Sequence, residues 1–333
     1  PNFEATESDI SVALLTDHLN TTKSKLAKQI GKRGVMEVLG DMQLLVGPPE
    51  QICISNAALM MFCEHLDKFF PYTQVEITKF PEGSIKNPNN FIEVPVIKGS
   101  VPTMIKRTME KLQDMVIEEK VTKVDYQMEA IRRYSYPYQA LEEAVVNAFY
   151  HRDYQSYQAI IIEIEPDCVR IISYPGIDRS ISQKTIAEGE RFKSRYYRNK
   201  RLGEFLKELD LTEGKSTGIP TIQEELRDNG SPKATFETDD ERRAVTVEIP
   251  IHPDFLMEQG EPQNEPQNEP QNATSVEDAI LQLIRMNKYV TREEMASQIE
   301  VSLSTVKRSI NKLKTSGIIE YEGPSKGGYW SIK

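Results

Sequence analysis

Cysteine is scarce in this chain, with three among 333 residues. They are Cys53, Cys63 and Cys168, and no two of them have the short spacing with which cysteines bind a metal. Their odd number and apolar neighbours are typical of buried, reduced thiols rather than of a disulfide framework. The scarcity excludes a zinc ribbon or a disulfide-rich secreted domain, and it predicts a cytoplasmic protein.

Long hydrophobic runs are also missing. No apolar run approaches the roughly 20 residues that cross a bilayer, and the chain does not open with a secretory signal. Apolar residues make up 38% of the chain and charged residues 28%, which is the composition of a folded globular protein. We therefore expect no membrane partner, and the length allows two or three domains.

Positive charge is in deficit, because the formal net charge is −10. The deficit is uneven: residues 273–333 carry nine Lys or Arg and seven Asp or Glu, whereas 257–272 carry four Glu and no base. Residues 1–256 therefore hold a net charge of −8. This distribution predicts that any contact with nucleic acid lies at the C-terminus.

Residues 261–272 repeat Glu-Pro-Gln-Asn three times and contain no apolar side chain. Such a segment cannot bury surface against a core, and its regular prolines favour extended backbone. We therefore predict a flexible linker over 257–274 that tethers the last domain to the rest of the chain.

Helical and strand periodicities alternate through the first 256 residues. Hydrophobic spacing predicts helices at 8–19, 21–29, 33–42, 56–65, 101–119, 137–154, 198–209 and 219–229. Alternation and turn residues predict strands at 52–54, 75–79, 91–97, 126–133, 159–165, 168–173, 235–238 and 244–250. Helices over a mostly antiparallel sheet make an α+β fold, a two-layer sandwich, which we divide into regions 1–125 and 126–256.

The helix predicted at 137–154 has two different faces. Its apolar stripe includes Leu141, Val145 and Phe149, which suits a helix lying on a core. Glu143, Asn147 and His151 follow at i, i+4 and i+8 and form a second, polar stripe. A carboxylate, an amide and an imidazole in one row could hold a metal-bound anion or a water, or could be a solvated face.

The block Glu-x-x-x-Asn-Ala-x-x-His-Arg-Asp-Tyr within this helix resembles the signature helix of the RecG-like, Schlafen/AlbA-associated bacterial transcriptional regulators. Weaker matches follow in the family's order, at 172–176, 198–206 and 215–219. The resemblance implies a middle domain with the GHKL ATPase fold. It also implies an AlbA-like module before the region that opens here; because Pro1 is not a start methionine, we expect a fragment that lacks this module.

By this resemblance Glu143 is the catalytic base that activates water and Asn147 binds magnesium, with Gly176, Thr217 and Gly218 contacting nucleotide. The chain departs from the pattern where GHKL enzymes carry an aspartate for the adenine amino group, because Ser173-Tyr174 stands there. The departure predicts a degenerate ATPase site and a protein that is not an enzyme. We expect no required cofactor, with ATP and magnesium as the ligand if the site is retained.

The order of elements changes again from 275 to 333. A first helix is predicted at 276–286. A second helix begins after Thr291, which forms a capping box with Glu294 three residues later. After a turn at 300–302, a third helix extends from about 303 to 316, and strands follow at 318–321 and 329–332. This order resembles the winged helix-turn-helix of bacterial regulators.

The third helix of this tail has the composition of a DNA-recognition helix. Val306, Ile310 and Leu313 face the core, and cations and short polar residues remain on or beside the outer face. Cations contact phosphates and short polar groups contact base edges. The predicted DNA-binding residues are Ser304, Thr305, Lys307, Arg308, Asn311, Lys312 and, on the wing, Lys326.

The resulting hypothesis is a DNA-binding transcriptional regulator that binds double-stranded DNA through its winged helix. The body would supply oligomerisation or ligand sensing, and two copies would place two recognition helices on spaced half-sites, so we expect a homodimer. Two alternatives stay open: an ATP-binding or ATP-hydrolysing GHKL-type enzyme that acts on nucleic acid, and a protein-docking adaptor.

Overall fold

The structure is a computed structural model that describes residues 1–123, 130–188, 197–212, 218–256, 276–299, 301, 303–315, 318–322 and 328–332. Its contacts divide the chain into two compact units, Pro1–Pro262 and Gln263–Lys333. Each unit has its own hydrophobic core. The predicted linker, 257–274, lies outside the described residues.

A mixed sheet forms the centre of the first unit. Among the described residues it has six strands in the order β4-β3-β7-β8-β10-β9. Only β3 and β7 pair in parallel, and the other neighbours are antiparallel. The strands are β3 (Val75–Lys79), β4 (Ile92–Glu93), β7 (Ile160–Ile164), β8 (Cys168–Ser173), β9 (Thr235–Thr238) and β10 (Val245–Pro250).

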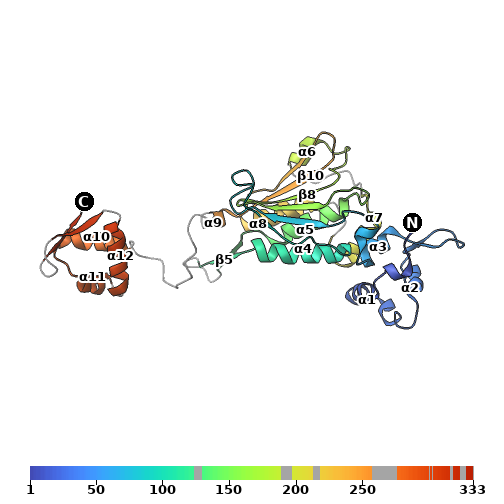
Figure 1. Cartoon of the computed structure of the whole chain (residues 1–333), viewed down its shortest axis with the longest axis horizontal. Helices are drawn as coiled ribbons and strands as arrows, with labels where there is room; N and C mark the ends of the chain where they lie inside the picture. Colours follow the sequence, from blue (N-terminus) through green and yellow to red (C-terminus); the bar gives the residue numbers. More distant parts are fainter. Residues whose placement is uncertain are drawn as a thin grey trace. The chain divides into compact units, whose positions relative to one another are not determined.

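Three long helices cover one face of this sheet: α4 (Val101–Val116), α5 (Tyr138–His151) and α8 (Gly218–Asn229). Figure 1 shows them together along one side of the strands. Ile160, Ile162 and Ile164 of β7 are buried while the residues between them are half-buried, as period-two alternation requires of a two-layer fold. The predicted α+β sandwich is confirmed.

The sheet also joins the two regions that the sequence analysis separated at residue 125. Strand β3 comes from the N-terminal region and pairs in register with β7, with Val75 opposite Ile160 and Lys79 opposite Ile164. Residues from both regions therefore contribute to one hydrophobic core.

Short elements precede β3 and pack against one end of the unit. They are η1 (Glu7–Asp9), α1 (Val12–Thr21), η2 (Lys25–Lys28), α2 (Val35–Asp41), β1 (Leu45–Val46), β2 (Cys53–Ile54), α3 (Asn56–Phe62) and η3 (Leu66–Lys68). The helix predicted at 21–29 is wrong. Helix α1 continues to Thr21, and Ser24 then caps a 3₁₀ turn by accepting a hydrogen bond from the Leu26 N–H at 3.3 Å.

Two predicted strands are shorter in the structure. The strand expected at 91–97 forms a ladder only at Ile92–Glu93, with a separate bridge from Ile97 to Val75. Pro95 lies between them and has no N–H for a ladder. Strand β6 (Ile131–Tyr134) pairs with β5 (Glu119–Thr122), and residues 126–129 of the predicted strand lie outside the described residues.

The connections after β8 complete the first unit. They are α6 (Gln183–Glu188), α7 (Lys200–Glu208) and α9 (Pro253–Leu256). Hydrophobic spacing predicts α7 within 198–209. It predicts neither α6 nor α9, because these two helices have too few residues to establish a helical period. None of the described helices is long and apolar enough to span a membrane.

The second unit is a small helical domain with a two-stranded sheet. It contains α10 (Val276–Met286), α11 (Arg292–Ile299), α12 (Leu303–Thr315), β11 (Ile319–Glu322) and β12 (Tyr329–Ile332). The strands pair antiparallel, with Ile319 opposite Ile332. Three helices followed by a hairpin is the predicted winged helix-turn-helix order.

Candidate functional site

The C-terminal unit holds α12 by a small apolar core. Val306, Ile310 and Leu313 lie on one side of the helix and are buried against α10, α11 and the hairpin. Trp330, the one tryptophan of the chain, closes this core and donates its indole N–H to the Val290 carbonyl at 3.1 Å. These contacts leave the other side of α12 facing solvent.

The described part of α12 has four exposed cations, and three of them belong to the predicted DNA-binding set; Lys314 is the fourth. Lys307, Arg308 and Lys312 are exposed on α12, and Thr305 is half-buried beside them. Ser309 is buried and was not among the predicted contacts. The predicted contacts Ser304 and Asn311 belong to α12, but their side chains lie outside the described residues, as does Lys326. The role of the set in DNA binding stays a prediction.

Helix α11 begins at the predicted capping box. The Thr291 N–H donates to the Glu294 carboxylate at 2.8 Å, and the Glu294 N–H donates to the Thr291 hydroxyl at 3.2 Å. The hydrogen bond from the Thr291 backbone lowers the pKa of Glu294, which keeps the carboxylate ionised at the positive end of the helix. The box satisfies two backbone N–H groups at the first turn of α11 and so sets where this helix begins.

In the first unit, the polar stripe of α5 contains a side-chain pair. Asn147 Nδ2 donates to Glu143 Oε1 at 3.1 Å, and both residues are half-buried. His151, the third member of the stripe, is exposed and stacks its ring near Tyr150 and Tyr197, with centroid separations of 4.9 and 6.0 Å. The stripe is therefore split: Glu143 and Asn147 face each other, and His151 lies among aromatic rings.

Gly218, the first residue of α8, lies directly against this pair. A Cβ built on Gly218 would be 2.5 Å from Glu143 Oε1 and 2.6 Å from Asn147 Nδ2. Only glycine therefore allows the start of α8 to approach the two side chains so closely. Backbone N–H groups at the start of a helix attract anions, so a carboxylate, an amide and a helix N-terminus converge at one point. Thr217, also predicted here, lies outside the described residues.

Gly176 makes its close contacts elsewhere. Its N–H donates to the Arg242 carbonyl at 2.9 Å, and a Cβ built on it would lie 2.6 Å from the Ala244 carbonyl oxygen. It therefore lies against the turn between β9 and β10. Of the predicted nucleotide contacts, the described contacts bring together Glu143, Asn147 and Gly218, and they place Gly176 on a different neighbour.

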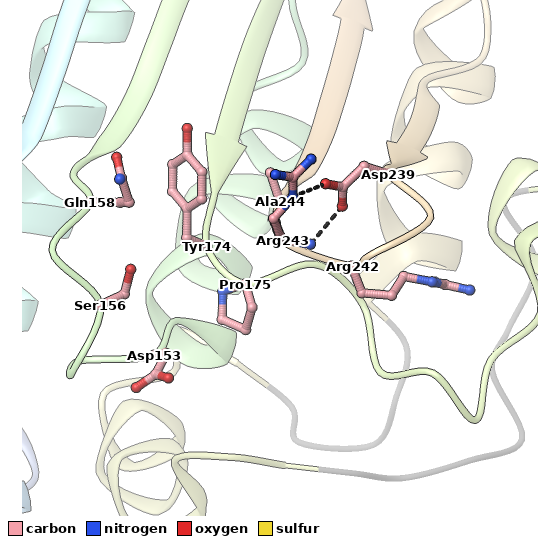
Figure 2. A pocket seen from close by; sticks show the side chains of 9 residues that line it. All are labelled: Asp153, Ser156, Gln158, Tyr174, Pro175, Asp239, Arg242, Arg243 and Ala244. Atoms are coloured by element: carbon pink, nitrogen blue, oxygen red, sulfur yellow. Dashed lines mark hydrogen bonds and ion pairs between the residues drawn. The ribbon is translucent and has the colours of Figure 1, made fainter.

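A cavity of about 590 Å³ opens beside Gly176, where β8 ends and β10 begins. Figure 2 shows Tyr174 extending along it, with Gln158 and Ser156 on one side and Arg243 hydrogen-bonded to Asp239 on the other. Tyr174 belongs to the Ser173-Tyr174 pair that, by the family resemblance, stands where GHKL enzymes carry the adenine-binding aspartate. No single sequence pattern predicts this cavity, because its lining comes from 153–158, 174–175 and 239–244.

Two residues that no sequence pattern singled out organise the end of α5. Arg152 is buried, with 1% of its surface exposed, and its Nη2 donates to the Tyr72 carbonyl at 3.0 Å. Asn199 donates through Nδ2 to the carbonyls of Tyr150 and Arg152, at 2.9 and 2.7 Å. These bonds tie the last turn of α5 to the residue before α7, 47 residues along the chain from Arg152. The only sequence signal for Arg152 and Asn199 was that each lies inside a block that resembles the regulator family, within 137–154 and 198–206 respectively.

Comparison with known proteins agrees with this architecture. Residues 158–248 match the family described as "Putative ATP-dependent DNA helicase recG C-terminal", and residues 276–329 match the family described as "HTH domain". No curated protein is significantly similar in sequence to the chain.

Among solved structures, the crystal structure of the DIP2311 protein from Corynebacterium diphtheriae superposes with a TM-score of 0.56 at 17% sequence identity. The match covers 99% of this chain and 63% of that one, so the chain spans less than two thirds of that protein's length. A likeness at this identity shows a shared fold. The chain thus combines an ATPase-like domain of the RecG C-terminal type with a C-terminal helix-turn-helix domain, as its sequence motifs predicted.

Proposed function

We propose that this protein is a transcriptional regulator that binds double-stranded DNA through α12. The observation that carries the proposal is the exposed row of Lys307, Arg308 and Lys312 on the third helix of a helix-turn-helix domain. The opposite side of the same helix is buried, so the row faces solvent in a fixed orientation.

The chemistry of the row suits the major groove, which is wide enough to admit a helix. Lys307, Arg308 and Lys312 contact phosphates and set the register, whereas Ser304, Thr305 and Asn311 contact base edges. Lys326, between β11 and β12, adds a phosphate contact from the wing. The acidic first unit supplies oligomerisation or ligand sensing, and a homodimer presents two recognition helices to half-sites about 34–36 Å apart.

The test replaces Lys307 and Arg308 by glutamate in the full chain. Wild-type protein shifts duplex fragments recovered by unbiased selection, and the double variant does not, because two phosphate attractions become repulsions. The matched control changes Arg285 and Lys106 to glutamate; both are exposed and neither lies on α12. A shift by the double variant equal to that of wild type would show that α12 does not bind DNA.

A protein-docking adaptor is the competing function of such a domain. It predicts a partner protein and no DNA affinity, whereas the regulator predicts that the logarithm of DNA affinity falls linearly with the logarithm of salt concentration. The same fragments titrated at several salt concentrations therefore separate the two functions.

A second candidate function is nucleotide binding by the first unit, and the convergence of Glu143, Asn147 and Gly218 favours it. The close approach of Glu143 and Asn147 to Gly218 places both side chains at the start of α8, where backbone N–H groups would attract the phosphates of a nucleotide. Bound Mg-ATP would supply phosphates for the helix N-terminus and a metal for Asn147. Glu143 would orient or deprotonate a water, and in a degenerate site the nucleotide serves as a sensed ligand.

Calorimetric titration with ATP in magnesium tests this second function. Wild-type protein releases heat on binding, and Asn147→Ala weakens the affinity tenfold or more. Asn20→Ala is the control, because Asn20 is an exposed amide on α1. Absence of heat from wild-type protein at millimolar ATP would remove the nucleotide from the function and leave the DNA-binding proposal standing.

A further inference from the structure

One stretch of the acidic first unit has the opposite charge. Residues 18–36 contain five Lys or Arg and no Asp or Glu, whereas residues 1–256 as a whole carry a net charge of −8. We define Lys23, Lys25, Lys28 and Lys32 as the lysine segment. All four side chains are exposed.

The lysine segment is held by an ordered backbone. Leu26, Ala27 and Ile30 pack against the main core from positions between the lysines. The Ser24 N–H donates to the Leu19 carbonyl at 2.9 Å, and the Gln29 N–H donates to the Leu26 carbonyl at 2.8 Å. The lysines therefore project from an anchored surface, in contrast to the charges of a solvated tail.

The carboxylates that follow the segment in sequence are already engaged. Glu37 and Asp41 both accept hydrogen bonds from Arg33, at 2.9 and 2.5 Å, so the nearest carboxylates in sequence are held by this arginine. Within the described part of the chain, the four lysines form no ion pair with a carboxylate. The segment thus presents four positive charges to solvent.

Helix α7 lies beside this part of the unit and extends its positive charge. Arg201 Nη2 donates to the Met42 carbonyl at 2.6 Å, and His18 Nε2 approaches Glu208 at 3.3 Å, so both ends of α7 contact the N-terminal elements. Figure 1 shows α7, α3 and α2 gathered at the same end of the unit. Lys200 and Lys207 of α7 are exposed, and its Glu204 forms an ion pair with Arg201.

We propose that the lysine segment is a second DNA contact, which binds the phosphate backbone of duplex DNA without reading its sequence. The proposal rests on the proposed function, because the helix-turn-helix domain is what makes duplex DNA the polyanion that this protein meets. Lysines act on phosphates as point charges, and four of them with no short polar neighbour aimed at base edges supply affinity without discrimination. An anionic lipid surface is the competing partner.

The experiment measures DNA affinity of the full chain against salt concentration, with Lys23, Lys25, Lys28 and Lys32 all changed to glutamine. Removing one lysine–phosphate interaction lowers the slope of log affinity against log salt by about 0.9, so we expect a slope smaller by about 3 to 4. Affinity falls equally for specific and random duplexes, because backbone contacts carry no sequence information. Changing the same four residues to arginine restores both quantities.

The matched control changes Lys86, Lys106, Lys111 and Lys233 to glutamine. These four are exposed and dispersed, and they alter the net charge by the same amount. A control that lowers the slope as much as the test variant would overturn the proposal, since net charge alone would then explain the effect. Binding of wild-type protein to phosphatidylserine vesicles, abolished in the test variant while DNA affinity is unchanged, would assign the segment to a lipid surface.

The outcomes also separate this inference from the proposed function. If wild-type protein binds duplex and the lysine variant binds with the same slope, only the second contact is wrong. If wild-type protein binds no duplex, the proposed function fails and the second contact fails with it. The Lys307→Glu, Arg308→Glu variant should not shift duplex in the gel assay, but at low salt, where phosphate contacts are strongest, sequence-independent binding by this variant that the four glutamines remove would support the second contact directly.

Discussion

Helices α5 and α12 both carry a polar stripe opposite an apolar one, yet the two stripes differ in what lies over them. The cations of α12 face solvent, and its described core contacts lie on the opposite side. The Glu143–Asn147 pair of α5 is half-buried beneath Gly218, which lies 71 residues beyond Asn147 in sequence. An exposed stripe suits a large partner that approaches from solvent, and a covered stripe suits a small ligand.

The two helices also differ in whether nearby or distant residues of the chain determine their surroundings. The described residues that form the core around α12 all belong to the C-terminal unit, between Ile280 and Ile332. By contrast, the α5 pair depends on α8 for its cover and on Asn199 for the end of its helix. Four changes test this contrast, and they follow from the largest expected effect to the smallest.

Ile310→Ala should destabilise the C-terminal domain alone. Ile310 is 1% exposed, and removing so buried a side chain costs about 2–5 kcal/mol, which is a large part of the stability of a small domain. Trp330 is the only tryptophan and lies in the same core, so its fluorescence reports this domain's unfolding in denaturant. Ile310→Ala should lower that midpoint, and Lys314→Ala, an exposed control on α12, should not. Equal midpoints would mean that Ile310 is not packed in the domain core.

Gly218→Val should weaken nucleotide binding at the Glu143–Asn147 pair without unfolding the first unit. The atoms that a Cβ would meet are the ends of two flexible side chains, which can rotate away at modest cost. We expect unfolding free energy to change by about 1 kcal/mol or less and ATP affinity to fall tenfold or more. Gly31→Val is the control, since nothing lies within 4 Å of a Cβ there. Unchanged ATP affinity in the Gly218 variant would separate α8 from the nucleotide site.

Thr291→Ala should weaken the second unit by removing one side of the capping box. Loss of an N-cap hydroxyl costs about 0.5–2 kcal/mol, and the Trp330 fluorescence midpoint should fall accordingly. Thr16→Ala on α1 serves as the comparison, because Thr16 lies within its helix and donates to the Val12 carbonyl instead of capping. If Thr291→Ala leaves the midpoint unchanged, the box does not determine where α11 begins.

His18 should make the first unit slightly sensitive to acid. Its ring is buried between Phe62 and Phe205, and this burial lowers the pKa of His18 against the opposing pull of Glu208 and Asp17. A lowered folded-state pKa means that stability is full above the unfolded value of about 6.5 and declines as pH falls below it.

The measurement compares unfolding free energies at pH 8 and pH 5.5 for wild type and His18→Gln. We expect wild type to lose up to about 1 kcal/mol more than the variant over this interval, whatever the variant costs at pH 8. A larger acid loss in the variant would reverse the sign of the argument and place a charged imidazole in the folded state.

Long periodic elements were predictable from sequence because each carries its own evidence. Helix α5 has an apolar stripe over four turns, and β7 alternates over five residues, so local pattern and burial agree. The strand predicted at 91–97 is wrong in its length because Pro95 interrupts the pairing. The apolar–polar alternation of the neighbouring residues had favoured a longer strand in spite of this proline. Helix α6 was missed because six residues cannot establish a period.

The sites divide in the same way. The exposure of Lys307, Arg308 and Lys312 follows from the helical period of α12 once its apolar side is identified. The position of Gly176 does not follow from any local pattern, because the neighbour it contacts is the β9–β10 turn some 65 residues later. The exposure of the lysine segment likewise depends on tertiary packing, because Leu26, Ala27 and Ile30 must pack against the main core for the lysines between them to face solvent.

The sequence by itself determined the α+β body, the helical tail with its hairpin, and the two helices that carry polar stripes, because hydrophobic period and capping chemistry act over a few residues. Only the tertiary structure decided that Gly218 covers Glu143 and Asn147, that Gly176 contacts another turn, and that four lysines project from an acidic unit. The physical reason is that burial depends on residues far apart in sequence that the fold brings together. The hydrophobic period of a single helix or strand carries no information about those distant residues.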